Sequence, residues 1–319
     1  MSSPPSMLHK GAVAVITGGA SGIGLASALR FAQRGMSVFL ADIDEKALKV
    51  AEDNVKGVEG VGEVLSMKVD TGNVEDVVKM REKVLDEFGE VHVLLNNAGT
   101  SRPCPAFSLS TPLAELQQNW ATTVGTNLHG IINVAQVFAP HMARQENASA
   151  IVCTGSKQGI TCPPGNAGYN VSKAGVKAYT EQLAHELRNT PGCNCTAHLF
   201  VPGWTYTGMT RSSSGKPAGA WTAEQTVDYM LDKVFDKGNF YVICPDNETS
   251  SQLDKLRIEW SLGDILQNRP PLSRWHPEYT ARFEEFITTR QGLQARSRSR
   301  GRPMIKDEYS YSDLPSPLP

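Results

Sequence analysis

The sequence predicts an α/β fold, a doubly wound parallel sheet in three αβα layers. Short runs of apolar, largely branched residues recur along the chain, and such runs are typical of strands buried on both faces of a sheet. Segments with helical apolar spacing separate these runs, and strands that alternate with helices form parallel sheets. Polar or glycine-rich residues follow several runs. They are therefore expected at the carboxyl ends of strands, where such sheets bind ligands.

Length and composition are those of a soluble globular protein. The chain has 319 residues, of which 40% are hydrophobic and 20% charged, and its formal net charge is -2. This charge predicts neither a nucleic acid nor an anionic membrane as a partner. No apolar run is long enough to span a bilayer, and the first ten residues do not resemble a signal peptide.

The six cysteines are scattered through the chain, and none are spaced as Cys-x-x-Cys. Cys193 and Cys195 are two residues apart, a spacing that suits alternate faces of a strand better than a metal site. We therefore expect reduced thiols, no bound metal and a cytoplasmic protein.

A glycine-rich turn at 17–24, with the sequence Thr-Gly-Gly-Ala-Ser-Gly-Ile-Gly, directly follows the first predicted strand at 12–16. Gly18, Gly22 and Gly24 let the backbone turn tightly and approach a ligand, and helical spacing follows. A strand, a glycine turn and a helix N-terminus form an anion site that suits the pyrophosphate of a dinucleotide. An ordinary glycine-rich turn is the alternative.

Asp42 closes the second predicted strand, residues 37–41, and lies eighteen residues after Gly24. An acid near this spacing accepts hydrogen bonds from the adenosine ribose hydroxyls, and it repels a 2'-phosphate. Asp42 therefore favours NAD over NADP, with a solvated aspartate at a strand end as the alternative.

The alternation of strands and helices continues along the chain. Asp70 and Thr71 follow one predicted strand, and Asn96–Gly99 follow the next. The further predicted strands are 64–69, 91–95, 150–154, 196–201 and 240–244, and the predicted helices among them are 25–34, 73–88 and 169–188.

Ser156, Tyr169 and Lys173 form the candidate catalytic set. Tyr169 and Lys173 are four residues apart and share one face of the predicted helix. A phenol with a pKa near ~10 acts as an acid or base at neutral pH only if its phenolate is stabilised, and a shift of about three units needs roughly 4 kcal/mol. A close ammonium can supply this, and the Ser156 hydroxyl can hydrogen-bond the reacting oxygen. Taken alone, the Tyr/Lys pair also fits a solvated helix face.

In their order along the chain, these motifs resemble those of the classical short-chain dehydrogenase/reductase family. The resemblance covers residues 10–245, and the joint set is far more specific than any one motif. It implies a Rossmann-type domain that binds the cofactor and carries the catalytic residues. The matching residues are the turn at 17–24, Asn96–Gly99, Asn127, Ser156, Tyr169 with Lys173, and Pro202 with Gly203.

The resemblance also implies roles. Tyr169 is the implied acid/base, and Ser156 holds the substrate oxygen. Lys173 binds the nicotinamide ribose and lowers the tyrosine pKa, and Asn127 supports a water relay to Lys173. The implied cofactor contacts are Gly18, Ser21, Gly22, Ile23, Gly24, Asp42, Asp70, Thr71, Asn97, Ala98, Gly99, Tyr169, Lys173, Pro202, Gly203, Thr205 and Thr207.

Residues 204–221 match the segment that the family uses as a mobile substrate lid. Trp204, Tyr206, Met209 and Trp221 lie in this segment and suggest an apolar or aromatic substrate. A packing role for one or two of these side chains is the alternative.

The sequence therefore predicts an NAD(H)-dependent oxidoreductase that interconverts an alcohol and a ketone on a small molecule, with Tyr169 as acid/base. The resemblance also implies a homo-oligomer, a tetramer or dimer, formed through the helices that contain Asn127 and Tyr169. Two alternatives stay open: a non-redox enzyme on the same scaffold, such as an epimerase, lyase or cyclase, and a nucleotide-sensing interaction protein. The intact catalytic set argues against both, because neither needs all of its members.

The chain continues past the family core. Residues 247–266 and 277–290 have helical character, and the second segment has an apolar face that we expect to pack on the same subunit or on a neighbour. That face consists of Tyr279, Phe283, Phe286 and Ile287. The expected divisions are 1–9 as an N-terminal tail, 10–245 as the Rossmann-type domain, 246–292 as a helical extension and 293–319 as a disordered tail. The tail arginines at 296, 298, 300 and 302 are expected to be solvated, with an anion contact as the alternative.

Overall fold

The structure is a computed structural model that describes residues 7–210 and 215–299. The chain divides into two compact units between Glu248 and Thr249, close to the predicted boundary at residue 245. Each unit has its own packing.

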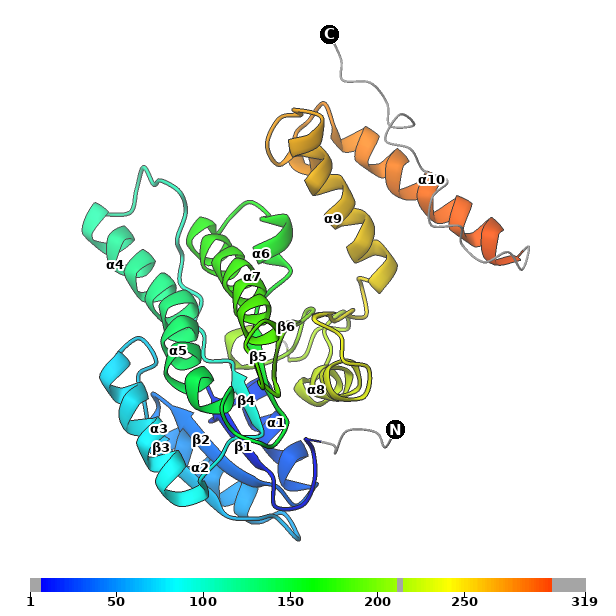
Figure 1. The fold of residues 1–319 in the computed structure, drawn as a ribbon. Coiled ribbons are helices and arrows are strands. Elements are labelled where there is room, and N and C mark those ends of the chain that lie inside the picture. Colours follow the sequence, from blue (N-terminus) through cyan, green and yellow to red (C-terminus); the bar gives the residue numbers. More distant parts are fainter. Residues whose placement is uncertain (1–6, 211–214, 300–319) are drawn as a thin grey trace. The chain divides into compact units, whose positions relative to one another are not determined.

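Within the described residues, the first unit contains one sheet of seven parallel strands in the order β3-β2-β1-β4-β5-β6-β7 (Figure 1). The predicted doubly wound α/β fold is confirmed, and each predicted strand is found within a few residues of its expected position. The strands are β1 (Val13–Thr17), β2 (Ser37–Asp42), β3 (Val64–Lys68), β4 (Val93–Asn96), β5 (Ser149–Thr154), β6 (Cys195–Val201) and β7 (Tyr241–Ile243).

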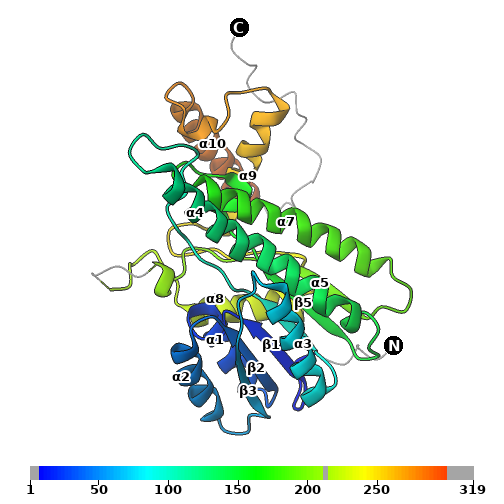
Figure 2. The same ribbon diagram turned by 90° about the vertical axis from the view of Figure 1, so that its left-hand side faces the viewer.

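Helices cover both faces of the sheet (Figure 2), and each face has its own apolar core. Alternate residues of β1 point to opposite faces, so Ala14 and Ile16 join one core while Val13 and Val15 join the other. The first core holds α1 (Gly22–Ala32), α2 (Glu45–Lys56) and α8 (Ala223–Leu231), and the second holds α3 (Val74–Phe88), α5 (Gly130–Met142) and α7 (Ala167–Arg188).

Further helical elements belong to this unit. They are α4 (Leu113–Val124), the π turn η1 (Gly125–His129), α6 (Gln158–Thr161), η2 (Gly208–Thr210) and the π turn η3 (Asp232–Asp236). None of the described helices is long and apolar enough to cross a membrane.

The sheet reverses its winding between β1 and β4. From β1 the chain moves outward to β2 and β3, whereas β4 begins the series that ends at β7. A crevice opens outside the carboxyl ends of the strands at such a reversal, because the connections leave in opposite directions. Thr17 ends β1 and Asn96 ends β4, so the residues after them lie at this crevice.

The second unit is a helical hairpin built from α9 (Ser251–Leu266), η4 (Ser273–Trp275) and α10 (Thr280–Ser299). Phe283 and Phe286 of the predicted apolar face pack on Trp260 of α9, at ring-centroid distances of 5.4 and 5.3 Å. Part of this face is therefore covered within the chain, as expected.

The last helix begins and ends later than the sequence predicted. It continues to Ser299, past residue 293, where disorder was expected. The sequence Gln-Gly-Leu-Gln-Ala-Arg at 291–296 is rich in good helix formers, and this helix propensity extends the helix beyond the predicted end. The rest of the predicted tail, 300–319, lies outside the described residues, as do residues 1–6 of the N-terminal tail.

Candidate active site

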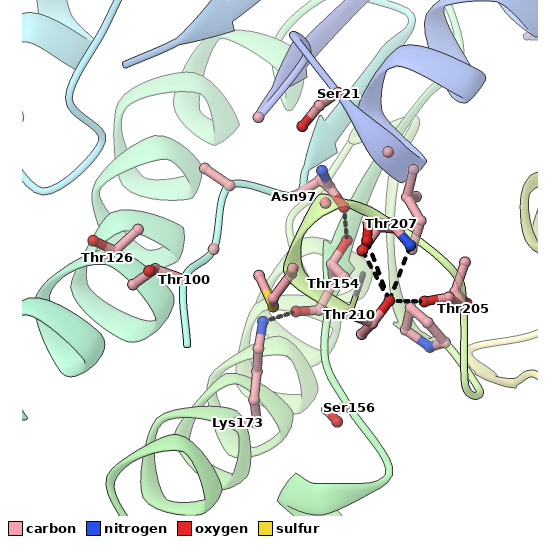
Figure 3. Close-up of a pocket in the computed structure, with 18 of the residues that line it drawn as sticks. Ser21, Asn97, Thr100, Thr126, Thr154, Ser156, Lys173, Thr205, Thr207 and Thr210 are labelled. Atoms are coloured by element: carbon pink, nitrogen blue, oxygen red, sulfur yellow. Dashed lines mark hydrogen bonds between the residues drawn. The ribbon is translucent and has the colours of Figure 1, made fainter. Parts of the chain in front are cut away.

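A cavity of about 660 Å³ lies at the carboxyl ends of the strands, lined by the segments that follow β1 to β6 and by α7 (Figure 3). Most of the predicted site residues line it. They are Gly18, Ser21, Gly22, Ile23, Asp42, Asp70, Thr71, Asn97, Ala98, Gly99, Ser156, Tyr169, Lys173, Pro202, Gly203, Trp204, Thr205, Thr207 and Met209. Gly24, Asn127, Tyr206 and Trp221 do not line the cavity.

The glycine turn needs backbone conformations that other residues rarely adopt. Gly18 and Gly22 have φ angles of +66° and +52°, and a Cβ on Gly18 would lie 3.0 Å from the Cα of Ala98. Ser21 precedes the first turn of α1 and makes no side-chain capping bond to it. The orphan N–H groups of this turn therefore border the cavity without a side-chain cap, which suits an anion.

Gly24 has a packing role instead of a lining role. A Cβ at this position would overlap the carbonyl oxygen of Gly18 and lie 2.8 Å from its carbonyl carbon. The absence of a side chain lets α1 close onto the turn that starts it.

Asp42 stabilises the same turn from the end of β2. Its Oδ2 accepts a hydrogen bond from the backbone N–H of Ala20 at 3.0 Å, and its Oδ1 accepts one from Asp44 at 3.1 Å. The carboxylate therefore lies at the cavity wall beside the glycine turn, where the sequence placed it.

Asn97 connects three neighbouring strands at the centre of the crevice. Its backbone N–H donates to Thr17 Oγ1 at 2.9 Å, and its Oδ1 accepts a hydrogen bond from Thr154 Oγ1 at 3.2 Å (Figure 3). These contacts join the ends of β1, β4 and β5, so the middle of the cavity has a rigid base.

Helix α7 brings Tyr169 and Lys173 to one wall of the cavity. Asn166 caps the helix by accepting a hydrogen bond from the Tyr169 N–H at 3.2 Å. Lys173 is 3% exposed, and its Nζ donates to the carbonyl oxygen of Thr154 at 2.8 Å (Figure 3). The same Nζ lies 5.9 Å from the centroid of the Tyr169 ring.

The electrostatics of this pair differ from the sequence expectation. Burial lowers the pKa of Lys173 from 10.5 to about 8. Burial also raises the pKa of Tyr169, and a hydrogen bond with the Ser156 side chain only partly opposes this rise. The pKa of Tyr169 is therefore raised and not lowered as the sequence predicted, because desolvation of the phenolate is the largest effect on it.

Asn127 is fully buried in the π turn between α4 and α5. Its Oδ1 accepts a hydrogen bond from the Thr100 N–H at 2.7 Å, and its Nδ2 donates to the Thr100 carbonyl oxygen at 2.9 Å. The side chain thus holds the loop after β4 in place and does not line the cavity. The relay role implied by the family stays a prediction.

The large apolar side chains of the predicted lid differ in their positions. Trp204 and Met209 line the cavity and are 38% and 52% exposed. Trp221 instead packs on Tyr229 at a centroid distance of 5.8 Å, and its Nε1 donates to Asn247 Oδ1 at 3.1 Å. Trp221 therefore has the packing role that the sequence left open. Residues 211–214 of this segment lie outside the described residues.

Asp246, which the sequence did not single out, joins three loops at this end of the sheet. Its Oδ2 accepts hydrogen bonds from Lys157 Nζ at 3.2 Å and from the Trp204 N–H at 3.0 Å, and its Oδ1 accepts one from Glu248 at 3.1 Å. The side chain is 5% exposed. No motif marks this residue, because it follows β7 and two of its partners, Lys157 and Trp204, lie far away in sequence.

Replacing Asp246 by asparagine is expected to lower the free energy of unfolding by about 2 kcal/mol, because Lys157 loses its carboxylate in a largely desolvated position. Urea unfolding measures this. The matched control is Asp232→Asn, whose ion pair with Lys233 lies at the surface and is expected to leave stability unchanged. Equal losses in the two variants would contradict a special role for Asp246.

Comparisons with known proteins agree with this geometry. The family model for short chain dehydrogenase matches residues 12–218. The 3-oxoacyl-(acyl-carrier-protein) reductase FabG of Thermotoga maritima is 36% identical over 205 residues, which are 64% of this chain and 78% of that protein.

Solved structures give the same result. A short chain dehydrogenase/reductase from Burkholderia phymatum in complex with NAD has a TM-score of 0.71 and 30% identity, covering 83% of this chain and 97% of that one. An NAD+-bound xylitol dehydrogenase has a TM-score of 0.56 and 32% identity, covering 62% and 72%. The fold, the arrangement of the site and these matches together show that the chain belongs to the classical short-chain dehydrogenase/reductase family.

Proposed function

We propose that this oxidoreductase uses NAD(H) to interconvert an alcohol and a ketone on a small molecule. The observation that carries the proposal is the convergence of Ser156, Tyr169 and Lys173 on a cavity that also reaches the glycine turn and Asp42. A cofactor held along this cavity would place its reactive end beside a proton donor.

The residues present fit a dinucleotide. The cavity volume is within the range of ligand sites, and the capless first turn of α1 suits a pyrophosphate. Near the ends of β2 and β3 the charged lining residues are Asp42 and Asp70, and the described lining there contains no cation. This local charge supports NAD over NADP, whose 2'-phosphate needs a positive partner. When bound, the nicotinamide supplies or accepts the hydride.

The side chains of the cavity then handle the proton. In the reductive direction Tyr169 Oη donates its proton to the carbonyl oxygen, while Ser156 donates a hydrogen bond to the same oxygen. The Lys173 ammonium favours the phenolate that remains. In the oxidative direction the phenolate takes the proton back from the alcohol.

The direct test is a titration of the protein with NADH and NADPH by fluorescence, followed by a panel of ketones and alcohols monitored by nicotinamide absorbance. We expect NADH to bind more tightly than NADPH, and we expect turnover of one class of ketone or alcohol in the panel. Tight binding without turnover would favour the non-redox enzyme or the nucleotide sensor. Failure to bind either cofactor would overturn the assignment of the glycine turn and Asp42.

Reduction and oxidation are expected to respond to pH in opposite directions. Reduction needs a protonated Tyr169, whose pKa is raised, and a charged Lys173, whose pKa is about 8, so its kcat/KM should be level at neutral pH and fall above about pH 8. Oxidation needs the phenolate and should rise over the same range. Steady-state measurements of kcat/KM from about pH 6 to about pH 10 test this in both directions. Profiles that change in parallel for reduction and oxidation would contradict the assigned proton transfer.

The predicted homo-oligomer is part of the same proposal. Val171 on α7, the helix of Tyr169, is 51% exposed, and Leu113 on α4, which leads into the π turn of Asn127, is 68% exposed. This exposure supports an interface on these elements. A cytoplasmic location also stays a prediction.

A further inference from the structure

We propose that the substrate carries a carboxylate and that Arg102 binds it. The proposal deepens the proposed function, on which it rests, and it concerns the loop between β4 and α4. The carrying observation is a guanidinium that makes no hydrogen bond or ion pair with the described part of the chain, on a loop whose backbone is firmly held beside Tyr169.

Charge is distributed unevenly along the cavity. Among the described lining residues, the carboxylates are Asp42 and Asp70, which follow β2 and β3, whereas the cations are Arg102, Lys157 and Lys173. The potential is therefore negative near the proposed adenosine end and positive near the catalytic residues, and an anionic substrate would be drawn to the second region.

Two of these three cations already have partners. Lys157 pairs with Asp246 at 3.2 Å, and the Lys173 ammonium donates to the Thr154 carbonyl oxygen. Arg102 has an exposed side chain that makes no hydrogen bond or ion pair with any residue that the structure describes. Its guanidinium can offer two parallel N–H donors to one carboxylate, the geometry in which arginine binds this group best.

The backbone around Arg102 is fixed on both sides. Its carbonyl oxygen accepts a hydrogen bond from Asn166 Nδ2 at 2.9 Å, and the carbonyl oxygen of Cys104 accepts one from the Gly168 N–H at 2.9 Å. Two residues earlier, both backbone groups of Thr100 are held by Asn127.

Asn166 and Gly168 lie at the start of α7, within one turn of Tyr169. The loop therefore places Arg102 in a defined position relative to the catalytic helix. A charged side chain on a fixed backbone is suited to ligand recognition, because binding a ligand does not have to order the loop and so costs little conformational entropy.

A role for Arg102 adds a carboxylate to the apolar or aromatic substrate that the sequence suggested. Trp204 and Met209 supply apolar surface, as the sequence suggested, but Thr100 and Thr126 add hydroxyl groups to another part of the wall (Figure 3). A molecule with an apolar portion, a carbonyl or hydroxyl and a terminal carboxylate satisfies all of these groups, whereas a purely apolar molecule leaves Arg102 unpaired.

The experiment compares 3-oxobutanoate, 4-oxopentanoate and 5-oxohexanoate with their neutral methyl esters, using the full chain and saturating NADH. We expect at least one acid to have a kcat/KM about tenfold above that of its ester, as for one charge-assisted contact. Arg102→Gln should raise KM for that acid about tenfold, with little change in kcat for the acid or in kcat/KM for the ester. Arg102→Lys should restore part of the lost preference for the acid. Arg144→Gln, which removes the same charge away from the cavity, is the matched control and should behave as wild type.

Equal use of acids and esters by the wild type would overturn the proposal, as would equal loss for both classes in Arg102→Gln. If NADH binds but nothing turns over, the proposed function fails by itself. Binding of the three acids to the NADH complex, measured by calorimetry, then decides the role of Arg102. Weaker binding in Arg102→Gln supports an anion site, and unchanged or absent binding overturns it.

Discussion

Tyr169→Phe is expected to lower kcat in both directions by about a thousandfold, within the range found for loss of a general acid or base. The phenol is the lining group placed to exchange a proton with the substrate oxygen, and phenylalanine keeps its ring but has no proton to give. Cofactor affinity should be nearly unchanged, because the ring still fills the same space. Stopped-flow absorbance and a fluorescence titration measure the two quantities separately.

The matched control is Tyr179→Phe on the same helix. Tyr179 is partly buried against the core between α7 and the sheet and does not line the cavity. Removing its hydroxyl makes the same chemical change and should leave kcat at the wild-type level. A Tyr169→Phe enzyme that retains more than a tenth of wild-type turnover would require another proton donor.

Gly24→Ala is expected to have the largest effect on stability and on cofactor binding together. The new methyl group would overlap backbone atoms of Gly18, and backbone cannot move aside as a flexible side chain can. We expect the free energy of unfolding to fall by about 3 kcal/mol, the upper part of the range for overpacking. The displaced turn should also weaken NADH binding by at least about tenfold, since its N–H groups would no longer be aligned.

Gly57→Ala tests whether the effect is specific to the turn. Gly57 ends α2 with φ of -73°, and a Cβ there would meet only ordinary contacts at 3.5 Å. Alanine should raise the free energy of unfolding by about 0.5 kcal/mol, because it reduces the conformational entropy of the unfolded chain. It should leave NADH affinity unchanged. Urea unfolding and NADH titration of both variants give the answer, and a Gly24→Ala protein as stable as wild type would mean that the turn can rearrange.

Strand positions could be predicted because the information is local. Residues 12–16 are all apolar and include three branched side chains, and β1 is buried on both faces in the structure. The glycine turn could be predicted for a similar reason, since Gly18 and Gly22 adopt positive φ angles that depend on their own lack of a Cβ. The order of strands and polar ends then places the predicted residues at one crevice, because parallel strands share the edge at which they end.

Side-chain contacts between distant segments could not be predicted in this way. Trp204 and Trp221 lie in one segment and look alike in sequence, but only the first lines the cavity, because the second pairs with Asn247. Asp246 acquires its importance only when the ends of β5, β6 and β7 come together.

Electrostatic properties depend on the tertiary structure for the same reason. The Tyr/Lys spacing indicated a shared helix face, which the structure has, but the pKa of Tyr169 is raised because burial outweighs the hydrogen bond with Ser156. The same holds for Arg102, which is one of many arginines in the sequence. Hydrophobic periodicity and backbone conformation depend on neighbouring residues. They define the fold, the glycine turn and the edge of the sheet where the site lies. Burial and charge pairing arise from residues far apart in sequence, so only the packed chain decides which groups are desolvated and which cation remains available to a ligand.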